Sequence, residues 1–408
     1  MIPRIRSLLL RLVLALAALA PALSLAAGPK AYVGNFKDNT VSVIDTASGR
    51  VLSTIPVASG PHGMSVSSDG RTVYVTGDES SGMSVIDTGS DKVVKTVEVG
   101  KTPHGIALTP DGKTLLVAVN GEDRVAFVDT ATQRVIGSVS ASKPHTIAVR
   151  PDGKLAYVAL QEPGKFGLAV IDLAARSVVR TIALQRTPRD LEFAHDGRAL
   201  YFTLAGVPAV QVLDPTTNVV VAEIPTGPSP HYANFFRNTS LGIVVVQGPG
   251  ELLLFDPATN KPVRSIAVGK QPHWVTASSD GKQAYVPNEG SNDFSIVELA
   301  SGKVTTVPVG NAPRKVVVQP TMSGGAGAKV SISNFAFVDA TVTISPGQRV
   351  TWSNDDAAPH AVAFKDGSAG ARSLSPGETF SRVFDKAGTY EYFCAFHPYM
   401  TGKVVVQG

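Results

Sequence analysis

Short runs of apolar and β-branched residues, separated by turns, fill positions 31 to 320 of the chain. Asp-Gly turns and Val-Ile-Asp-Thr segments recur between these runs. In one stretch we predict four strands in succession, at 103–112, 113–119, 124–130 and 134–139. The same arrangement returns every 41 to 44 residues, so this part of the chain consists of repeats of four strands.

A proline followed by His or Arg marks the start of each repeat. The marks are Pro61-His62, Pro103-His104, Pro144-His145, Pro188-Arg189, Pro230-His231, Pro272-His273 and Pro313-Arg314. Four short strands at this period indicate a β-propeller in which each repeat forms one blade.

The two ends of the repeat region complement each other. Three predicted strands precede the first mark, at 31–34, 40–46 and 51–57, and a single strand follows the last mark, at 315–319. Because three strands and one strand make a blade, we expect the last strand to pair with the first three and close the ring. The sequence therefore predicts an all-β chain whose first domain, residues 29–320, is a seven-bladed propeller.

Two phrases of this region carry a family resemblance. Asn-Thr-Val-Ser-Val-Ile-Asp-Thr at 39–46 and Thr-Pro-Asp-Gly-Lys at 109–113 resemble the repeat of the YVTN family of seven-bladed propellers. That family is defined by its repeat and not by an activity, so the resemblance implies a fold and leaves the function open. Residues 321–328, which are rich in Gly and Ala, are expected to form a flexible linker.

Alternating apolar positions resume after the linker. We predict strands at 329–337, 341–345, 349–353, 360–364, 388–393 and 402–406. Strands of this length, without helical segments between them, predict a second domain at residues 329–408 that is a small Greek-key β-sandwich.

Four residues of this second domain have the chemistry of a metal site. Cys394, His397 and Met400 follow one another at intervals of three residues, and His360 heads a predicted strand upstream. One thiolate, two imidazoles and a weak axial thioether suit copper in an electron-transfer role. A lone Cys is more often a buried small apolar residue. However, the single Cys of the chain lies at ligand spacing from His and Met, which favours a copper site.

The same motifs resemble the cupredoxins, and among them the amicyanin type. The resemblance covers residues 329–408 and rests on four motifs: Cys-x2-His-x2-Met, the Pro359-His360 pair, Ala-Gly-Thr-Tyr before the Cys strand, and Met-x-Gly-Lys-Val-Val-Val after it. It implies a single type 1 copper ion that carries electrons. In that family an Asn usually follows the first His ligand and braces the Cys loop, but here the position is Ala361. We expect copper binding to survive, but the sequence does not fix the rigidity of the loop or the tuning of the potential.

The residue after each marker proline enters the innermost strand of its blade, so we expect seven such residues to surround the axial tunnel of the propeller. We call these seven positions the inner ring. They are His62, His104, His145, Arg189, His231, His273 and Arg314.

Two interpretations of the inner ring remain open. Imidazoles bind copper and arginines bind anions, so the ring is a candidate for a second metal site or an anion site. Alternatively, repeat expansion has copied His five times without a use for it, and this interpretation is favoured. A histidine-lined propeller followed by a cupredoxin domain resembles the architecture of nitrous oxide reductase. The electron-entry centre of that enzyme needs two Cys ligands, however, and this chain has one Cys.

The N-terminus has the pattern of an export signal. Arg4, Arg6 and Arg11 precede or flank an apolar stretch at 12–25, and small residues follow it, so we predict a cleaved signal peptide at 1–26. No later apolar run is long enough to span a membrane. Loss of the three arginines lowers the formal charge from +4 to about +1, which is too little positive charge for a nucleic-acid-binding protein. The mature chain is expected to be periplasmic or secreted.

These observations lead to one functional prediction and one alternative. The first is an exported electron carrier that exchanges electrons with a redox partner protein, such as a dehydrogenase, a cytochrome or a reductase, while the propeller serves as a docking domain. The alternative is a copper oxidoreductase with further copper at the inner ring. In that case, head-to-tail association of two chains would bring the copper of one over the ring of the other. The chain carries no nucleotide-binding loop, nucleophile–base motif or haem attachment sequence, so we assign no catalytic residue.

Overall fold

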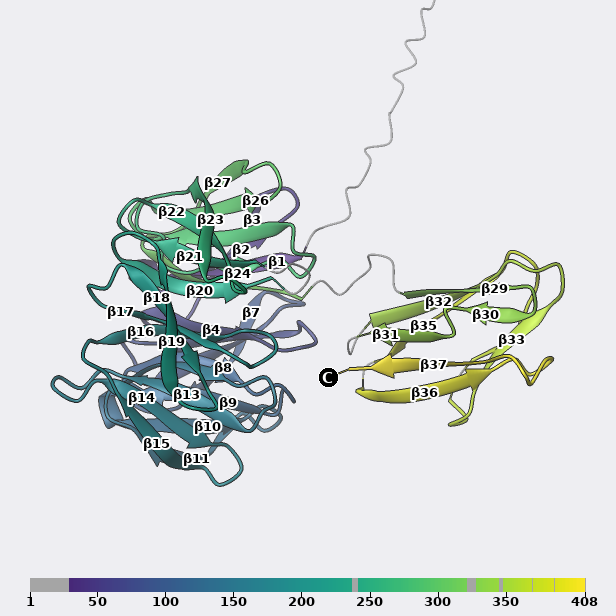
Figure 1. Cartoon of the computed structure of the whole chain (residues 1–408), viewed down its shortest axis with the longest axis horizontal. Helices are drawn as coiled ribbons and strands as arrows, with labels where there is room; N and C mark the ends of the chain where they lie inside the picture. Colours follow the sequence, from purple (N-terminus) through teal and green to yellow (C-terminus); the bar gives the residue numbers. More distant parts are fainter. Residues whose placement is uncertain are drawn as a thin grey trace, which may run out of the picture.

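The computed structural model describes residues 29–236, 241–320, 328–344, 348–368, 370–384 and 386–407. Within these ranges the chain is all-β, as predicted, and forms two separate domains (Figure 1). The first consists of seven four-stranded sheets, and the second is a sandwich of a four-stranded and a five-stranded sheet. The predicted signal peptide at 1–26 and all but the last residue of the predicted linker lie outside the described residues. None of the helices within the described ranges is long and apolar enough to cross a membrane.

Each blade of the propeller is an antiparallel sheet, and six of the seven are made of four consecutive strands. The strands, with two single-turn 3-10 helices, are β1 (Lys30–Asn35), η1 (Phe36–Asp38), β2 (Thr40–Asp45), β3 (Arg50–Pro56), β4 (Pro61–Val66), β5 (Thr72–Gly77), β6 (Gly82–Asp87), β7 (Lys92–Glu98), β8 (Pro103–Leu108), β9 (Thr114–Val119), η2 (Asn120–Glu122), β10 (Arg124–Asp129), β11 (Arg134–Ser140), β12 (Pro144–Val149), β13 (Leu155–Leu160), β14 (Gly167–Asp172), β15 (Ser177–Ala183), β16 (Pro188–Phe193), β17 (Leu200–Leu204), β18 (Ala209–Asp214), β19 (Val219–Pro225), β20 (Pro230–Phe235), β21 (Gly242–Val246), β22 (Glu251–Asp256), β23 (Lys261–Ala267), β24 (Thr276–Ala277), β25 (Gln283–Asn288), β26 (Asp293–Glu298), β27 (Val304–Pro308) and β28 (Pro313–Val318).

The two middle strands of each blade hold the core of the propeller. In β9 and β10, for example, nearly every residue is buried, because neighbouring sheets pack on both faces of the blade. Strands packed on both faces become nearly continuous apolar runs, whereas the outer strand β11 keeps mostly exposed side chains. This layering explains why the repeat is so regular in sequence.

The seventh blade is closed by both ends of the domain, as the sequence predicts. The last strand, β28, pairs antiparallel with the first, β1, and Val316 lies opposite Val33. The resulting sheet has the order β28-β1-β2-β3. Closure in this way leaves the propeller without a free inner edge.

The inner strand is bulged at its start in most blades, which the sequence pattern does not reveal. In β4, β8, β12, β16 and β20 the pairing register shifts between the marker proline and the residue three positions later. A bulge re-aims the side chains at its unpaired positions. The inner-ring residue occupies such a position in each of these strands.

The sixth repeat departs from the predicted four full strands. Its inner strand is reduced to β24, two residues long, and Pro272 is joined to Asn288 by an isolated bridge. His273 to Val275, which lie between Pro272 and β24, are not part of the strand. In this blade, therefore, the first part of the inner strand does not form regular β-pairing.

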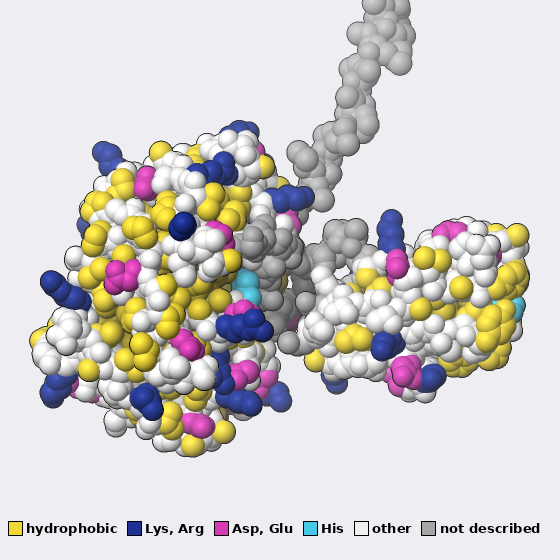
Figure 2. Space-filling model, in the orientation of Figure 1, with side chains coloured by type: hydrophobic (Ala, Val, Ile, Leu, Met, Phe, Trp, Pro, Cys, Tyr) yellow, Lys and Arg dark blue, Asp and Glu magenta, His cyan; other side chains and the backbone are white. Residues whose placement is uncertain are grey.

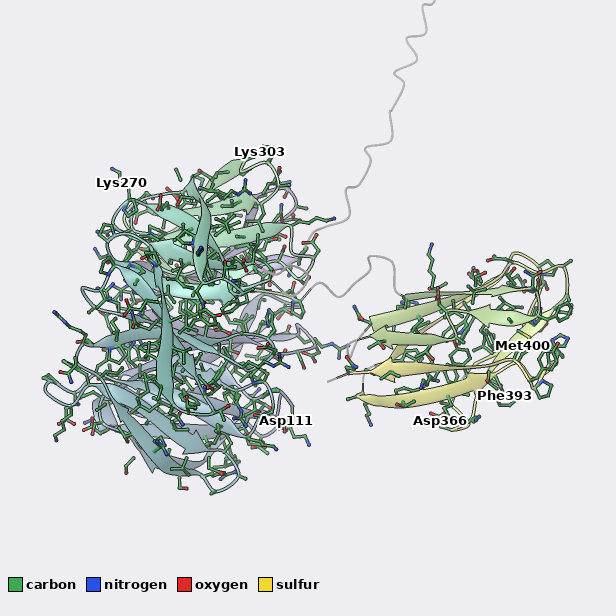
Figure 3. The ribbon with its side chains drawn as sticks, in the orientation of Figure 1. Asp111, Lys270, Lys303, Asp366, Phe393 and Met400 are labelled. Atoms are coloured by element: carbon green, nitrogen blue, oxygen red, sulfur yellow. The ribbon has the colours of Figure 1, made fainter. Side chains whose placement is uncertain are left out.

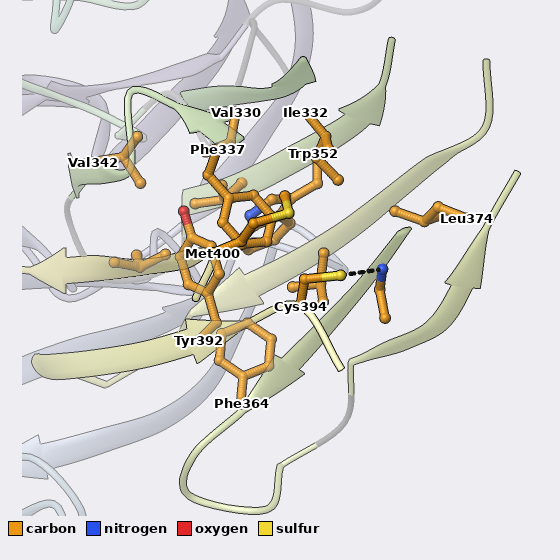
Figure 4. Close-up of a cluster of buried hydrophobic side chains, with 14 of the residues drawn as sticks. Val330, Ile332, Phe337, Val342, Trp352, Phe364, Leu374, Tyr392, Cys394 and Met400 are labelled. Carbon is orange, nitrogen blue, oxygen red and sulfur yellow. Dashed lines mark hydrogen bonds between the residues drawn. The ribbon is translucent and has the colours of Figure 1, made fainter. Parts of the chain in front are cut away.

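The second domain is a two-sheet sandwich. Its strands are β29 (Ala328–Ser333), β30 (Ala336–Val338), β31 (Thr341–Ile344), β32 (Gln348–Asn354), β33 (His360–Phe364), β34 (Ala371–Leu374), β35 (Thr379–Phe384), β36 (Gly388–Phe393) and β37 (Thr401–Val406). One sheet has the order β30-β29-β32-β35 and the other β31-β37-β36-β33-β34. Trp352, Phe364 and Tyr392 pack between them in a core that also contains Cys394 and Met400 (Figure 4).

One predicted strand of the sandwich is wrong. The segment 329–337 was expected to be continuous, but the chain turns at Asn334 and Phe335 to form the hairpin β29–β30. Both turn residues have left-handed backbone angles, with φ of 52° and 55°. The backbone N–H groups of both donate to the carboxylate of Asp356, which stabilises the turn. Two further strands, β34 and β35, were not predicted.

Candidate metal centre

The ends of two neighbouring strands position the candidate ligands. β33 begins at His360, and β36, which pairs with it, ends one residue before Cys394. Figure 3 shows Phe393, the last residue of β36, and Met400 close together at one end of the sandwich. The predicted metal residues of the second domain therefore converge at a single place.

The loop from Cys394 to Met400 is held by its own backbone. The N–H of His397 donates to the carbonyl of Cys394 at 3.2 Å, and the N–H of Met400 donates to the carbonyl of His397 at 2.9 Å. The N–H of Cys394 donates back to the carbonyl of Met400 at 3.0 Å. These three bonds fold the loop tightly, and the side chain of His397 therefore lies next to that of Cys394.

The donor atoms of three residues meet at the end of this loop. The Sγ atom of Cys394 lies 3.7 Å from Nδ1 of His360 and 3.7 Å from Nδ1 of His397. All three donors are within 4.8 Å of one another. Because a small transition-metal ion lies about 2.0–2.3 Å from nitrogen and sulfur ligands, such separations suit three ligands of one ion. The donor set is that of a His2Cys copper site.

The site is buried except at one ligand. Cys394 and His360 have no exposed surface and Met400 has almost none, whereas His397 is partly exposed. Met400 belongs to the same packed cluster as Cys394, which places its side chain at the core side of the loop. A buried thiol and thioether beside one partly exposed imidazole make a site that is shielded from water but open at His397.

The position of Ala361 changes how the Cys is supported. Its backbone N–H donates to Sγ of Cys394 at 3.3 Å, drawn as the dashed line in Figure 4. A hydrogen bond to the Cys sulfur stabilises the thiolate and tunes the metal potential. The side-chain brace expected from an Asn is missing at this position, but the backbone donor remains.

Asp356 orients His360 and was not found from the sequence. Its carboxylate lies 3.0 Å from Nε2 of His360, on the side of the ring away from Cys394. The N–H groups of Phe335 and Asn334 hold the pKa of this carboxyl below its ordinary value, so it stays charged. A carboxylate that accepts the second N–H of a metal-binding imidazole fixes the tautomer and orientation of the ring. The only sequence signal was an acidic residue four positions before a His.

In the propeller, the five histidines of the inner ring converge, and the two arginines bond side chains of neighbouring blades; Glu289, the partner of Arg314, also lies 3.9 Å from Nε2 of His273. The ring of His104 lies between those of His62 and His145, with centroids 3.8 Å apart on each side and planes tilted by 38° and 32°. The rings of His231 and His273 lie 4.1 Å apart and are tilted by 44°. Arg189 donates to Ser229 and Gln247. Arg314 forms an ion pair with Glu289 and stacks on Phe36.

The donor atoms of the inner ring are more widely spread than those of the second domain. Among the described residues, only His360, Cys394 and His397 bring three ligand atoms within 4.8 Å. Burial lowers the pKa of His62, His104 and His273 well below the ordinary value. It lowers the pKa of His145 to about 4. These four imidazoles are therefore neutral near pH 7.

The two domains match different families of known proteins. Residues 326–407 match the family model described as copper binding proteins, plastocyanin/azurin family. Amicyanin-alpha of Methylorubrum extorquens is 40% identical over 84 residues, which cover 71% of that protein and 19% of this chain. Through its C-terminal domain the chain belongs to the plastocyanin/azurin family. This cupredoxin domain is also 37% identical over 83 residues to amicyanin of Paracoccus versutus, of which the match covers 63%.

The propeller has a family match and a structural likeness of its own. Residues 13–110 match the model of a YNCE-like beta-propeller. Hydrazine synthase of Kuenenia stuttgartiensis superposes with a TM-score of 0.59 at 22% identity, over 68% of this chain and 92% of that one. At this identity the likeness shows the fold and does not extend to activity.

Replacing Asp356 with Asn is expected to raise the reduction potential of the copper-loaded cupredoxin domain. The carboxylate makes the His360 imidazole a stronger donor, which stabilises Cu(II) more than Cu(I). If its loss weakens Cu(II) binding about 10-fold relative to Cu(I), the potential rises by about 59 mV. A redox titration of the full chain measures the shift. The control is Asp355→Asn, because Asp355 bonds Ser331 and Ser353. Equal potentials in the two variants would contradict the role of Asp356.

Proposed function

We propose that this chain is an exported type 1 copper protein that transfers one electron at a time. His360, Cys394 and His397 would hold the copper, and Met400 would add a weak thioether ligand. The meeting of one thiol and two imidazoles at 3.7 Å, in a domain of the plastocyanin/azurin family, carries the proposal. When bound, copper supplies an ion that cycles between Cu(II) and Cu(I).

The residues around the ligands support electron transfer rather than substrate chemistry. The ligand loop is tied by three backbone hydrogen bonds, and the three donor atoms lie within 4.8 Å of one another. A preorganised donor set needs little rearrangement when the charge of the ion changes by one. Burial of Cys394 and Met400 keeps water and small substrates away from the soft ligands.

The exposed edge of His397 marks where electrons would leave. The ring centroid of Phe335 lies 5.0 Å from that of His397, and the ring centroid of Tyr399 lies 6.1 Å from it. Phe335, Phe396 and Tyr399 are exposed, with Tyr399 reaching 71%. Figure 2 shows hydrophobic side chains gathered around a histidine at one end of the domain. An exposed apolar patch of this kind suits a small, transient interface with a redox partner protein.

The propeller is proposed to act as a docking or scaffold domain for that partner. Its blades give a large rigid surface, closed by the pairing of β28 with β1. Rigid propellers are common platforms for binding proteins or ligands at the ends of the tunnel.

Electron self-exchange between two copies of the chain tests the proposed function. In a redox titration, the copper-loaded wild-type protein should take up one electron per chain. We expect Tyr399→Glu to slow self-exchange about 10-fold or more, because two like charges then meet at the docking face, while the colour and potential stay the same. Line broadening in proton NMR spectra of mixed oxidation states measures the rate.

Val383→Glu is the matched control, because Val383 is an exposed residue of β35, in the sheet that does not carry the ligand strands β33 and β36. It should leave the self-exchange rate near that of the wild type. Equal slowing in both variants would contradict electron exit through the His397 face. A protein that binds copper but takes up no electron would contradict the function as a whole.

A further inference from the structure

One position of the propeller repeat changes its character in four neighbouring blades. It is the second residue after each marker proline. At Gly63 and Gly105 a Cβ atom would lie 2.1 and 2.3 Å from a carbonyl oxygen of the next inner strand, so glycine is required there. In the last four blades the position holds four larger side chains, and copying of one repeat does not explain them because all four differ. In chain order the seven residues are Gly63, Gly105, Thr146, Asp190, Tyr232, Trp274 and Lys315.

The larger side chains form a continuous series of contacts from blade to blade. The hydroxyl of Tyr232 donates to the carboxylate of Glu192 in the preceding inner strand. The rings of Tyr232 and Trp274 stack with centroids 3.3 Å apart and planes only 12° from parallel. Nζ of Lys315 lies 3.3 Å from the centroid of the Trp274 ring. The amine of Lys315 is therefore held over an aromatic face at the end of this series.

Lys315 is the only buried lysine in the described part of the chain, with 7% of its surface exposed. Its Nζ has no hydrogen-bond or ion-pair partner among the described residues. The partly buried Lys30, by contrast, pairs with Asp91 at 2.7 Å. Unlike Nδ1 of His273, which is fully enclosed without a partner, Nζ of Lys315 keeps some contact with solvent. An apolar side chain would fill this space without the cost of burying an unpaired ammonium, so stability does not account for the lysine.

The surroundings of Lys315 favour the unprotonated amine. Burial lowers the pKa of its ammonium to about 8, although the nearby carboxylates of Asp190 and Glu192 oppose this effect. The imidazoles near enough to feel its charge are neutral at pH 7, since burial lowers their pKa values; they belong to His104, His145 and His273. An unprotonated lysine has a free electron pair, and a buried lysine of this kind is typical of Schiff-base chemistry.

We propose that Lys315 binds a small neutral aldehyde as a Schiff base inside the propeller. The electron pair of Nζ attacks the carbonyl carbon, and a C–N bond forms. The two hydrogens of the amine then leave with the carbonyl oxygen as one water molecule, so the step needs neither an oxidant nor a reductant. The carboxylates of Asp190 and Glu192 disfavour a ligand that carries a negative charge of its own. This site is independent of the electron transfer proposed for the cupredoxin domain.

Reductive trapping in the full chain tests the site. The protein is incubated at pH 7 with acetaldehyde and sodium cyanoborohydride, which reduces an imine to a stable secondary amine, and mass spectrometry of its peptides locates the labelled lysines. Lys270 is the internal reference, because it is exposed at the surface of the propeller (Figure 3). We expect Lys315 to be labelled at least about 10-fold faster than Lys270, because more of its amine is unprotonated. Labelling at the rate of Lys270 or slower would overturn the proposal.

The ratio of these two rates gives a second readout in the wild-type protein. It should fall as the pH is raised from 7 to 10, because the amine of Lys315 is already mostly unprotonated above about pH 8, whereas an ordinary lysine gains free amine up to about pH 10. A ratio that does not change with pH would contradict a specially reactive Lys315.

Glyoxylate identifies the class of ligand, since it carries the same aldehyde group beside a carboxylate. Its preference for Lys315 over Lys270 should be weaker than that of acetaldehyde. An equal or stronger preference would refute the assignment to a neutral aldehyde.

Lys315→Met keeps the length of the side chain and removes the amine. The wild type should show one fast-reacting amine per chain and this variant none, while the matched control Lys270→Met should retain it. Thermal unfolding checks that both variants are folded, and the rate ratio in the wild type decides the matter if Lys315→Met is not. Unchanged fast labelling in folded Lys315→Met would show that another amine is responsible.

Discussion

Cys394→Ser is expected to abolish the intense visible colour of the oxidised, copper-loaded protein. The colour of a type 1 site arises from charge transfer between the Cys thiolate and Cu(II), and a hydroxyl oxygen does not form this short covalent bond. The side chains have similar size, and Ser can still accept the hydrogen bond from the N–H of Ala361. We therefore expect the whole band to disappear while the domain stays folded. A visible absorption spectrum of the copper-loaded full chain measures it.

Ala395→Ser is the matched control, because it introduces the same hydroxyl one position away in the ligand loop. It should retain the band. Retention of the band in the Cys394 variant would show that another residue supplies the charge transfer, and a colourless copper-loaded wild type would exclude a type 1 site.

Val316→Asp is expected to destabilise the propeller severely. Val316 has no exposed surface, lies opposite Val33 in the closing strand and packs in a cluster with Phe294 and Ile44. The substitution buries a carboxylate among apolar side chains. We expect a loss of more than about 4 kcal/mol in the free energy of unfolding, which is at the upper end for single substitutions. Thermal and urea unfolding followed by circular dichroism measure the change.

The control places the same charge on an outer strand. Val263 in β23 is 54% exposed, and Val263→Asp should change the stability by no more than about 0.5 kcal/mol. If Val316→Asp unfolded no more easily than this control, closure through β28 would not be needed for stability.

The architecture of the propeller could be predicted because its information is repeated. Marker prolines every 41 to 44 residues and strands left over at both ends predicted seven blades and closure through β28, as the structure shows. The bulges at the inner strands were missed, because a hydrophobic pattern gives the period of a strand and not its pairing register. For the same reason the shortened β24 was not foreseen.

The site in the cupredoxin domain was predicted only for side chains with distinctive chemistry. His360, Cys394 and His397 meet as expected. The N–H of Ala361 left no signal, since every residue except proline has such a donor. Asp356 was missed because its role depends on the turn at Asn334 and Phe335, where the sequence pattern predicts a continuous strand.

The inner ring shows a different limit of sequence patterns. Equivalent positions in a repeat predicted seven side chains directed into the tunnel. Arg189 and Arg314 instead bond groups of other blades, Gln247 and Glu289. These partners are distant in sequence and are themselves ordinary polar residues. Only the three-dimensional neighbours of each position distinguish the five converging histidines from the two arginines.

The joining of β28 to β1 has a consequence for how the chain is made. Asn35 pairs with Pro313, so the first strand must wait until almost the whole propeller has been synthesised before its partner exists. Until then β1 is an unpaired edge, open to pairing with other chains. Contacts so distant in sequence also form slowly. A nascent or truncated chain that stops before residue 313 would therefore need a chaperone to hold it, whereas a chain that has passed this point can seal its own edge.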